Sequence, residues 1–539
     1  MLSSLSSTIS RLNLFYPKPS IPYSLSSCLK TLKPQPIIPR WSPLHSLSTH
    51  STSRLSTSLK PQFETLVSKD DLVVLGIETS CDDTAAAVVR GNGEILSQVV
   101  SSQADLLAKY GGVAPKMAEE AHSQVIDQVV QEALDKANLT ATNLSAVAVT
   151  IGPGLSLCLR DEFVPVKTCA TRLKNGSISK PYREVLMEYV NLGFQLVGVR
   201  KARKLAGSFN LPIIGIHHME AHALVARLIE RELQFPFMAL LISGGHNLLI
   251  LAHDLGHYIQ LGTTIDDAIG EAYDKTAKWL GLDMSRSGGP ALEELAREGD
   301  AESIKFSVSY LSYFLFVHLL IFSLLSCLLE CTPMKQHKDC NFSYAGLKTQ
   351  VRLAIESKNM YVENTKLLLS LIMCSNAEIP ISSASSQDRR SRADIAASFQ
   401  RVAVLHLEER CDRAIEWARK IEPSIKHLVV SGGVASNQYV RARLDHVVTK
   451  NSLQLVCPPP KLCTDNGVMV AWTGIEHFCM GRFDPPPPAD EHEDYMYDLR
   501  PRWPLGEEFA EGRSEARSLR TARIHPSLTS IIQASLQQQ

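Results

Sequence analysis

The chain has 539 residues, of which 45% are hydrophobic and 21% are charged. These fractions are ordinary for a soluble globular protein and exclude wholesale disorder, and the length predicts two lobes with appendages. Of the 55 basic residues, 7 lie in the first 63 positions, so 48 remain against 56 acidic residues. That balance excludes a globally basic nucleic-acid binder, and the 12 cysteines, which form no CxxC pair, argue against a structural zinc or a disulfide scaffold.

The first 63 residues contain no Asp or Glu, while their Lys and Arg residues lie among many serines, threonines and prolines. This composition is typical of an organellar transit peptide, so residues 1–70 are predicted to be a targeting or disordered segment. A mitochondrial address is favoured over a plastid one. The alternative is a disordered tail without an address.

Residues 72–77 form a short apolar run that predicts a buried strand, and a polar turn leads into a second strand at 85–89. The same pattern of strand, small polar turn and strand recurs at residues 237–251. Short side chains and free backbone N–H groups in such turns can approach an anion closely. The recurrence predicts an internal duplication, with an N-terminal lobe over 71–236 and a C-terminal lobe over 237–480.

A third glycine turn at 431–434 follows a predicted strand and leads into a predicted helix at 437–446. This transition from strand to helix points backbone donors at a ligand. Beyond residue 480 a run of four prolines begins a polar, charged stretch, and residues 481–539 are predicted to form a peripheral tail.

His218 and His222 lie four residues apart in a segment that favours a helix, so both imidazoles share one face and can bind one ion. The alternative is a pair of surface histidines. A zinc protease needs a glutamate directly after the first histidine, whereas Glu220 lies about 200° around the helix and cannot act as its general base. Asp465, in a turn before a predicted helix at 468–478, is the expected third ligand, and a helix cap is its alternative role. Two nitrogens and one oxygen suit Fe or Zn and also admit Mn or Mg.

Short motifs follow one another in a specific order: Gly76–Asp82, Gly152–Leu155, His218–His222, Ser243–His246, Asp266–Lys275, Gly288–Pro290, Phe342–Thr349, Ser431–Asn437 and Thr464–Asn466. Together they resemble the tRNA N6-adenosine threonylcarbamoyltransferase family, and in particular its organellar, mitochondrial branch. The resemblance extends from about residue 72 to residue 480.

The resemblance implies an α/β chain with the actin-like, sugar-kinase-like ATPase fold, in which two duplicated lobes close on a nucleotide cleft. It implies transfer of the threonylcarbamoyl group of threonylcarbamoyl-AMP to N6 of the adenosine 3′ of the anticodon, in tRNAs reading ANN codons, with release of AMP. A homodimer and one divalent metal ion per subunit are also implied. Only local basic patches could contact the tRNA, and the candidates are Arg200–Lys204, Arg389–Arg392 and Arg441–Arg443.

By matching motif, His218, His222 and Asp465 would bind the metal. The residues that would hold the adenylate are Ile242, Ser243, Gly244, Gly245, His246, Asp274, Gly289 and Asn437. Within that set, Asp274 could instead pair with a neighbouring lysine, and Gly289 could simply cap a turn. Asp82 or a water is the candidate general base.

Three stretches interrupt the family pattern, at residues 160–196, 309–332 and 360–376. The second lies in a run from 306 to 329 without Asp, Glu, Lys or Arg, which as a helix would be about 36 Å long and long enough to cross a bilayer. Because it joins two parts of one catalytic core, no true transmembrane span is expected. The hypothesis for all three is translated, unspliced introns.

The hairpins and glycine turns alone would equally suit an ATP-dependent kinase or chaperone-like protein of the same fold, but neither needs the histidine pair. A non-catalytic nucleotide-binding scaffold, inactivated by the inserts, is another alternative. A metalloprotease is disfavoured by the position of Glu220.

Overall fold

The structure is a computed structural model that describes residues 68–81, 83–103, 115–153, 197–284, 287–306, 334, 337–359, 380–490 and 499–509. Residues 1–67 of the predicted targeting segment, the three predicted inserts and Asp82 lie outside these ranges. Among the described residues, no helix combines the length and the apolar character that a bilayer span needs.

The first sheet contains β1 (Val73–Glu78), β2 (Asp83–Arg90), β3 (Ile95–Ser102), β4 (Ala146–Gly152) and β5 (Ile213–His217). Its strand order is β3-β2-β1-β4-β5. The first three strands form an antiparallel meander, whereas β4 and β5 run parallel to β1. The central strands are apolar without alternation because helices cover both of their faces.

The second sheet contains β6 (Phe237–Ile242), β7 (Asn247–Asp254), β8 (His257–Thr263), β9 (His427–Ser431), β10 (Gln454–Val456) and β11 (Glu507–Glu508). Its order is β10-β9-β6-β7-β8-β11. Without β11 it repeats the first sheet, with an antiparallel meander of β6, β7 and β8 and with β9 and β10 parallel to β6. The predicted duplication and the α/β class are thus confirmed, and the repeated topology is the actin-like, sugar-kinase-like arrangement expected from the resemblance.

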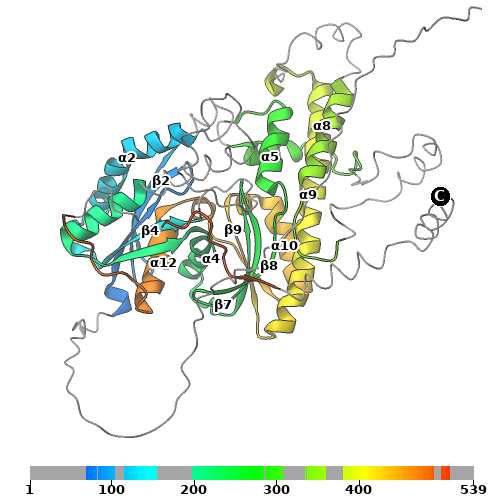
Figure 1. Ribbon diagram of the computed structural model, residues 1–539. Coiled ribbons are helices and arrows are strands. Elements are labelled where there is room, and N and C mark those ends of the chain that lie inside the picture. The colour runs from blue at the N-terminus through cyan, green and yellow to red at the C-terminus, as the bar shows by residue number, and fades with distance from the viewer. Residues whose placement is uncertain are drawn as a thin grey trace, which may run out of the picture. The chain divides into compact units, whose positions relative to one another are not determined.

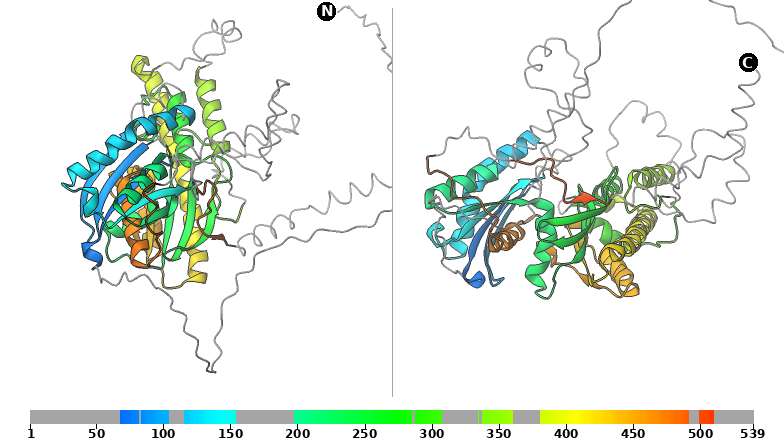
Figure 2. Two further views of the ribbon diagram at one scale, coloured as in Figure 1. Left: turned by 60° about the vertical axis from the view of Figure 1, so that its left-hand side comes forward. Right: turned by 60° about the horizontal axis from the view of Figure 1, so that its bottom comes forward.

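Helix α2 (Pro115–Lys136) covers one face of the first sheet, and α4 (His218–Ile229) and α12 (Gly467–Cys479) cover the other (Figures 1 and 2). By sequence α12 falls in the predicted C-terminal lobe, yet it packs on β1, β2 and β4. Gly76 permits this close approach, because a Cβ there would collide with the backbone of Gly467 and Ala471. A helix from the C-terminal part of the chain therefore completes the hydrophobic core of the first sheet.

Helix α9 (Ser386–Ile421) packs on the second sheet, and α5 (Ile269–Trp279), α6 (Gly288–Ala296) and α8 (Ala345–Asn359) pack against α9 in the same core. Figure 1 shows α5, α8 and α9 side by side. Helix α10 (Gln438–Lys450) follows the third glycine turn as expected, and α11 (Pro460–Cys463) precedes the turn that carries Asp465. Residues 197–209 are also helical. The 3-10 helices within the described ranges are η1 (Lys69–Asp71), η2 (Ala141–Asn143), η5 (Ile381–Ser383) and η6 (Gly433–Ser436).

Candidate metal and nucleotide site

Helix α4 presents the histidine pair at its N-terminal end. His218 and His222 are both buried, and their ring centroids are 4.7 Å apart. The helix begins directly after β5, where Nδ1 of His217 accepts the backbone N–H groups of Met219 at 3.1 Å and Glu220 at 3.4 Å. An imidazole thus takes the place of the usual small polar cap, and it fixes the first turn of the helix from which both rings project.

Asp465 lies in the turn between α11 and α12, and its carboxylate faces the two imidazoles. Its Oδ1 is 2.9 Å from Nε2 of His222 and 3.6 Å from Nε2 of His218. One ligand atom from each of the three residues lies within 4.8 Å of the others. The cap of α12 is Asn466, whose Oδ1 accepts the N–H of Met469 at 2.9 Å. The alternative role of Asp465 as a helix cap is therefore taken by its neighbour.

A second layer of polar groups holds the ring of His218. Its Nδ1 lies 2.9 Å from Oγ of Ser80 and 3.2 Å from Oε2 of Glu78. Glu78 is fully buried, and it also accepts the Thr150 hydroxyl at 2.6 Å and the N–H of Ser80 at 2.6 Å. With Nδ1 engaged in this way, Nε2 of His218 faces Asp465. Histidines that bind metals usually have their other nitrogen oriented by a carboxylate in this manner.

The charges of His218, Asp465 and Glu78 shift one another's pKa values. Burial would lower the pKa of His218, but the carboxylates of Asp465 and Glu78 outweigh burial and raise this pKa to about 9. Burial would raise the pKa of Asp465, but His218 and His222 hold it well below its usual range. The pKa of Glu78 is also lowered, against its burial, by His218. Two buried carboxylates thus favour a positive charge at this place.

Glu220 faces away from the histidine pair. Its carboxylate accepts the hydroxyl of Tyr258 at 2.6 Å and lies 3.0 Å from Nε2 of His477. Burial would raise the pKa of Glu220, but the bond from His477 lowers it below its usual range. Glu220 therefore ties α4 to β8 and α12, and it is not placed to act on a water at the histidine pair.

The predicted glycine turns converge near the same group. The turn at Ser243–His246 joins β6 to β7, and burial followed by the charge of nearby His218 lowers the pKa of His246 to about 4. Gly432 follows β9 with φ of +100° and packs on the backbone of Ile242, where any side chain would collide. A Cβ would meet nothing within 4 Å at four glycines of these turns and of α6, which are Gly244, Gly245, Gly289 and Gly433. These positions border open space, as a turn that approaches a ligand requires.

Asp274 and Asn437 lie where α5, α6 and α10 meet. Oδ1 of Asp274 accepts the N–H of Gly288 at 2.9 Å, so this carboxylate lies beside the predicted Gly289. Asn437 caps α10 by accepting the N–H of Val440 at 3.0 Å, and its amide donates to Gln400 at 3.1 Å. A cavity of about 330 Å³ opens next to these residues, between α6, α9 and α10. Its polar lining includes Glu293, Gln400 and Tyr439.

The basic clusters are largely engaged within the chain. Arg389 pairs with Glu298, and Arg392 with Asp388. Arg441 donates to backbone carbonyls of Ala435 and Pro458, and Arg443 pairs with Glu408. In the third cluster, Lys201 binds Asp127 at 2.6 Å, while Arg200 and Lys204 are exposed. Exposed charge therefore remains at Arg390 of the first cluster and on the helix at 197–209.

Sequence reasoning gave no role to Glu78, Ser80, Thr150 or His217. Glu78 and Ser80 stand within a recognised motif, but their bond to His218 spans about 140 residues of chain. The doubled histidine at 217–218 was the only local signal for the cap. The C-terminal Trp503, whose carbonyl oxygen accepts Nε2–H of His217 at 2.9 Å, left no local signal at all.

The comparisons with known proteins agree with this geometry. The family described as TsaD, tRNA N6-adenosine threonylcarbamoyltransferase, matches residues 94–178 and 196–472. A probable mitochondrial tRNA N6-adenosine threonylcarbamoyltransferase of Arabidopsis thaliana is 67% identical over 488 residues, which are 90% of this chain and 85% of that protein. The mitochondrial enzyme of Xenopus tropicalis is 37% identical, covering 76% of this chain and 83% of its own length. The enzyme of Rhizobium etli is also 37% identical, covering 80% and 94% respectively. The chain therefore belongs to the tRNA N6-adenosine threonylcarbamoyltransferase family.

Proposed function

We propose that this chain transfers the threonylcarbamoyl group of threonylcarbamoyl-AMP to N6 of the adenosine 3′ of the anticodon in tRNAs reading ANN codons, with release of AMP. The observation that carries the proposal is the meeting of His218, His222 and Asp465 beside the glycine turn that holds His246. Family membership supports the reaction class. The alternative of a kinase or chaperone-like ATPase gives no reason for this convergence.

We infer that His218, His222 and Asp465 hold one divalent metal ion, of which Fe or Zn fits best and Mn or Mg is admitted. The residues fit the ion, because two Nε2 atoms and a carboxylate oxygen converge and one imidazole is oriented by Glu78. When bound, the ion would supply a Lewis acid for negative charge that develops on the donor.

The nucleotide part of the donor would lie along the glycine turns. Backbone at Ser243, Gly244 and Gly245, which follow Ile242, can approach a phosphate because no side chain intervenes. The cavity between α6, α9 and α10 has the size of a nucleoside site, and its lining includes Gln400, which accepts the amide N–H of Asn437. Asp274 would then lie near the ribose hydroxyls. By holding the nucleotide in place, these residues would orient the carbamoyl carbon for attack by the exocyclic amine of the adenosine.

Neutral His246 closes the glycine turn and lies near His218. Because its pKa is lowered to about 4, its imidazole carries no charge near pH 7 and can donate one N–H hydrogen bond to an oxygen of threonylcarbamoyl-AMP. Asp82 stays a candidate general base from the sequence alone, since it lies outside the described residues. A water is the other candidate.

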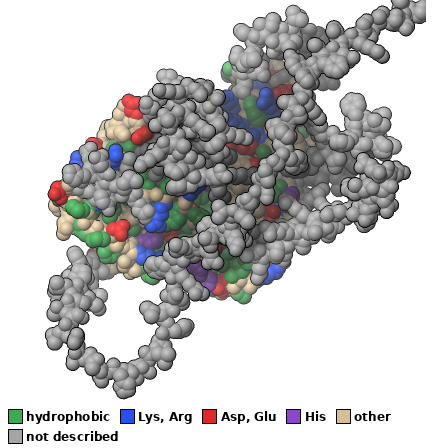
Figure 3. All heavy atoms as spheres, viewed as in Figure 1, with side chains coloured by type: hydrophobic (Ala, Val, Ile, Leu, Met, Phe, Trp, Pro, Cys, Tyr) green, Lys and Arg blue, Asp and Glu red, His purple; other side chains and the backbone are tan. Residues whose placement is uncertain are grey.

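The tRNA would require a basic surface. Lys and Arg side chains gather on the face near α5 and α8 (Figure 3), and the exposed Arg200 and Lys204 lie on the helix at 197–209. A mitochondrial address is supported by the acid-free N-terminal segment and by the names of the relatives, with a plastid address as the alternative. A homodimer is inferred from the family resemblance.

The test is reconstitution of the full chain with threonylcarbamoyl-AMP and organellar tRNA, with the modified adenosine measured by mass spectrometry. We expect modification by the wild type and a loss of at least about 100-fold in His222→Ala, since a metal ligand is removed. The matched control is His253→Ala, because His253 is an exposed histidine that contacts Glu422 and His257 and belongs to neither the metal site nor the glycine turns. Phosphate release from ATP without any modified adenosine would contradict the proposal and favour the kinase-like alternative.

A further inference from the structure

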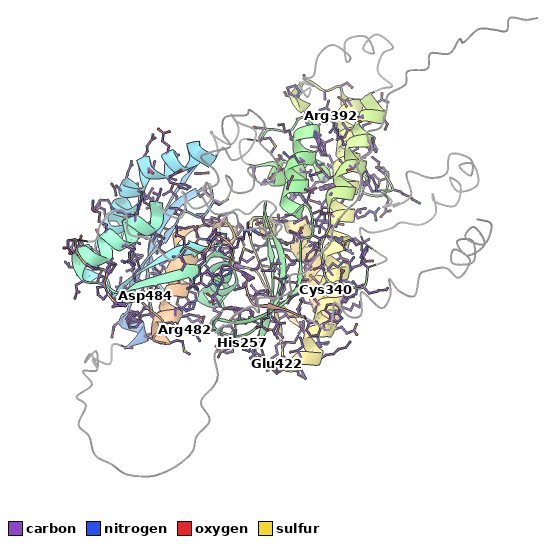
Figure 4. The ribbon with its side chains drawn as sticks, in the orientation of Figure 1. His257, Cys340, Arg392, Glu422, Arg482 and Asp484 are labelled. Atoms are coloured by element: carbon purple, nitrogen blue, oxygen red, sulfur yellow. The ribbon has the colours of Figure 1, made fainter. Side chains whose placement is uncertain are left out.

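The chain that follows α12 contacts both sheets in turn. The guanidinium of Arg482 donates to the carbonyl of Leu255 in the β7–β8 turn at 2.9 Å. Two residues later, Asp484 pairs with Ile213 at the start of β5 through backbone bonds of 2.9 and 3.1 Å. Figure 4 labels these residues, with Arg482 between Asp484 and His257 of β8. The segment after α12 is thus bound to the second sheet and then to the first.

Residues 499–509, here called the C-terminal strap, also contact both sheets, and they do so near the N-terminal end of α4. The strap begins on the first sheet, where Leu499 packs against its core. The N–H of Arg500 donates to the carbonyl of Ile151 at 2.8 Å. Position 152 must be glycine for this contact, because a Cβ on Gly152 would collide with the carbonyl of Arg500. The strap therefore lies at the end of β4, beside the strand that leads into α4.

Trp503 connects the strap to the cap of α4. Its carbonyl oxygen lies 2.9 Å from Nε2 of His217, and the two ring centroids are 4.6 Å apart. The guanidinium of Arg500 covers the Trp503 ring at 4.6 Å. Because a carbonyl can only accept, Nε2 of His217 must carry the hydrogen, and its Nδ1 is left as the acceptor that caps Met219 and Glu220. The strap thus sets the tautomer on which the helix cap depends.

The strap ends on the second sheet. Leu505 is 5% exposed and packs in the cluster that includes Met219 and Ala223 of α4. Glu507 and Glu508 form β11 beside β8, which Figure 2 shows in red next to the green strands. The N–H of Phe509 donates to Gln260 at 2.9 Å. The strap is therefore anchored on both sheets, with α4 held between the anchors.

We propose that the C-terminal strap positions the metal-binding helix, with Trp503 as a positioning residue that acts through His217. The inference rests on the proposed metal site. His218 follows His217 directly, so any displacement of the helix cap displaces a ligand. Metal–ligand distances tolerate only about 0.2 Å, so a small displacement at the cap weakens binding. Loss of the strap contacts would therefore weaken the metal site although no strap residue is a ligand.

The experiment uses the full chain with Trp503→Ala, Trp503→Phe and His217→Asn, and with Trp279→Ala as control. Trp279 is a half-buried tryptophan of α5 that contacts Arg352, so the control removes the same side chain away from α4. Two quantities are measured: hydrogen exchange of the peptide that covers the first turn of α4 in metal-free protein, and Zn²⁺ affinity by chelator competition.

Trp503→Ala keeps the backbone carbonyl that accepts from His217 but removes the indole ring that packs on His217 and that Arg500 covers. We therefore expect it to loosen the strap, to accelerate exchange in that peptide and to lower Zn²⁺ affinity by about 10-fold, the lower end for groups that orient a metal ligand. Trp503→Phe keeps the ring contact and should restore both values, and Trp279→Ala should leave both unchanged. Wild-type exchange and affinity in Trp503→Ala would overturn the proposal.

His217→Asn covers the case in which Trp503→Ala does not fold. Asparagine is a good helix cap but is too short to reach the strap, so we expect folded protein with weakened Zn²⁺ binding. Wild-type Zn²⁺ affinity in that variant would also overturn the proposal. Failure of the wild type itself to bind Zn²⁺ would contradict the proposed metal site, whereas the exchange measurement on metal-free protein tests the strap separately.

Discussion

Metal-free protein should lose stability as the pH rises from 6.5 to about 8.5, and bound metal should abolish this loss. The pKa of His218 is raised from 6.5 to about 9 in the folded state, so its contribution to stability is complete below 6.5 and is lost as the pH rises through about 9. Since a pKa difference of one corresponds to about 1.4 kcal/mol, the linkage relation gives a loss of about 2 kcal/mol across this window.

His218 makes the largest contribution to the pH dependence of stability in this window. The pKa values of Asp465 and Glu78 are lowered in the folded state, so their contributions to stability do not change with pH in this window, which lies well above their unfolded pKa values. Those of His217 and His246 are lowered to about 4, so both are neutral in the folded state, and the loss of their protons in the unfolded state adds about 0.8 kcal/mol of stability as the pH rises from 6.5 to 8.5. This gain offsets part of the loss from His218. Buried thiols such as Cys457, with a pKa of about 11, affect stability only as the unfolded thiol ionises near and above pH 8.5.

The assay is urea unfolding of metal-free and Zn²⁺-loaded protein across this pH range. Metal binding requires a neutral imidazole, so the loaded protein should show no loss from His218, and Zn²⁺ affinity should rise with pH as the His218 proton is displaced. His218→Asn in metal-free form should abolish the loss of stability over this range and serves as the control. Equal stability of metal-free wild type at both ends of the range would refute the assignment of a protonated His218 between two carboxylates.

Three further substitutions test the packing and hydrogen bonds around the site. Glu78→Gln should weaken Zn²⁺ binding by about 10- to 100-fold in chelator competition, because the amide cannot hold His218 as a carboxylate does, and unchanged affinity would contradict its orienting role. Gly76→Ala should lower the free energy of unfolding in urea by about 3 kcal/mol, because the new methyl collides with the backbone of α12, and a neutral result would exclude this close approach. Asn466→Ala should cost about 1 kcal/mol in the same assay through loss of the α12 cap, and a wild-type midpoint would show that the cap does not contribute.

The parts of the fold that depend on local pattern could be predicted from the sequence. The runs at 72–77 and 237–242 are strands, and the repeated hairpins mark the two similar sheets. The spacing of His218 and His222 places them on one helical face, because four residues are close to one turn. The choice between metal ligand and helix cap for Asp465 could not be made locally, since it depends on Asn466 taking the cap.

Contacts between distant parts of the chain could not be predicted. Nothing in the sequence of α12 indicates that it packs on β1, almost 400 residues earlier, rather than on its neighbours in the chain. The polar composition after residue 480 predicted a peripheral tail, whereas residues 499–509 pack on both sheets. A signal was present, since Leu499, Trp503 and Leu505 are apolar residues within this charged stretch, but composition averaged over the tail concealed it.

The position of α12 bears on how the protein is made. Strands β1 to β5 leave the ribosome first, and α4 follows them, but the apolar face between Val74 and Ile214 stays only partly covered until residues 467–479 have been synthesised. Asp465 emerges at the same late stage. The first sheet is therefore not an autonomous folding unit during translation. A nascent chain that stalls before α12 would expose this face and would depend on chaperones to avoid aggregation.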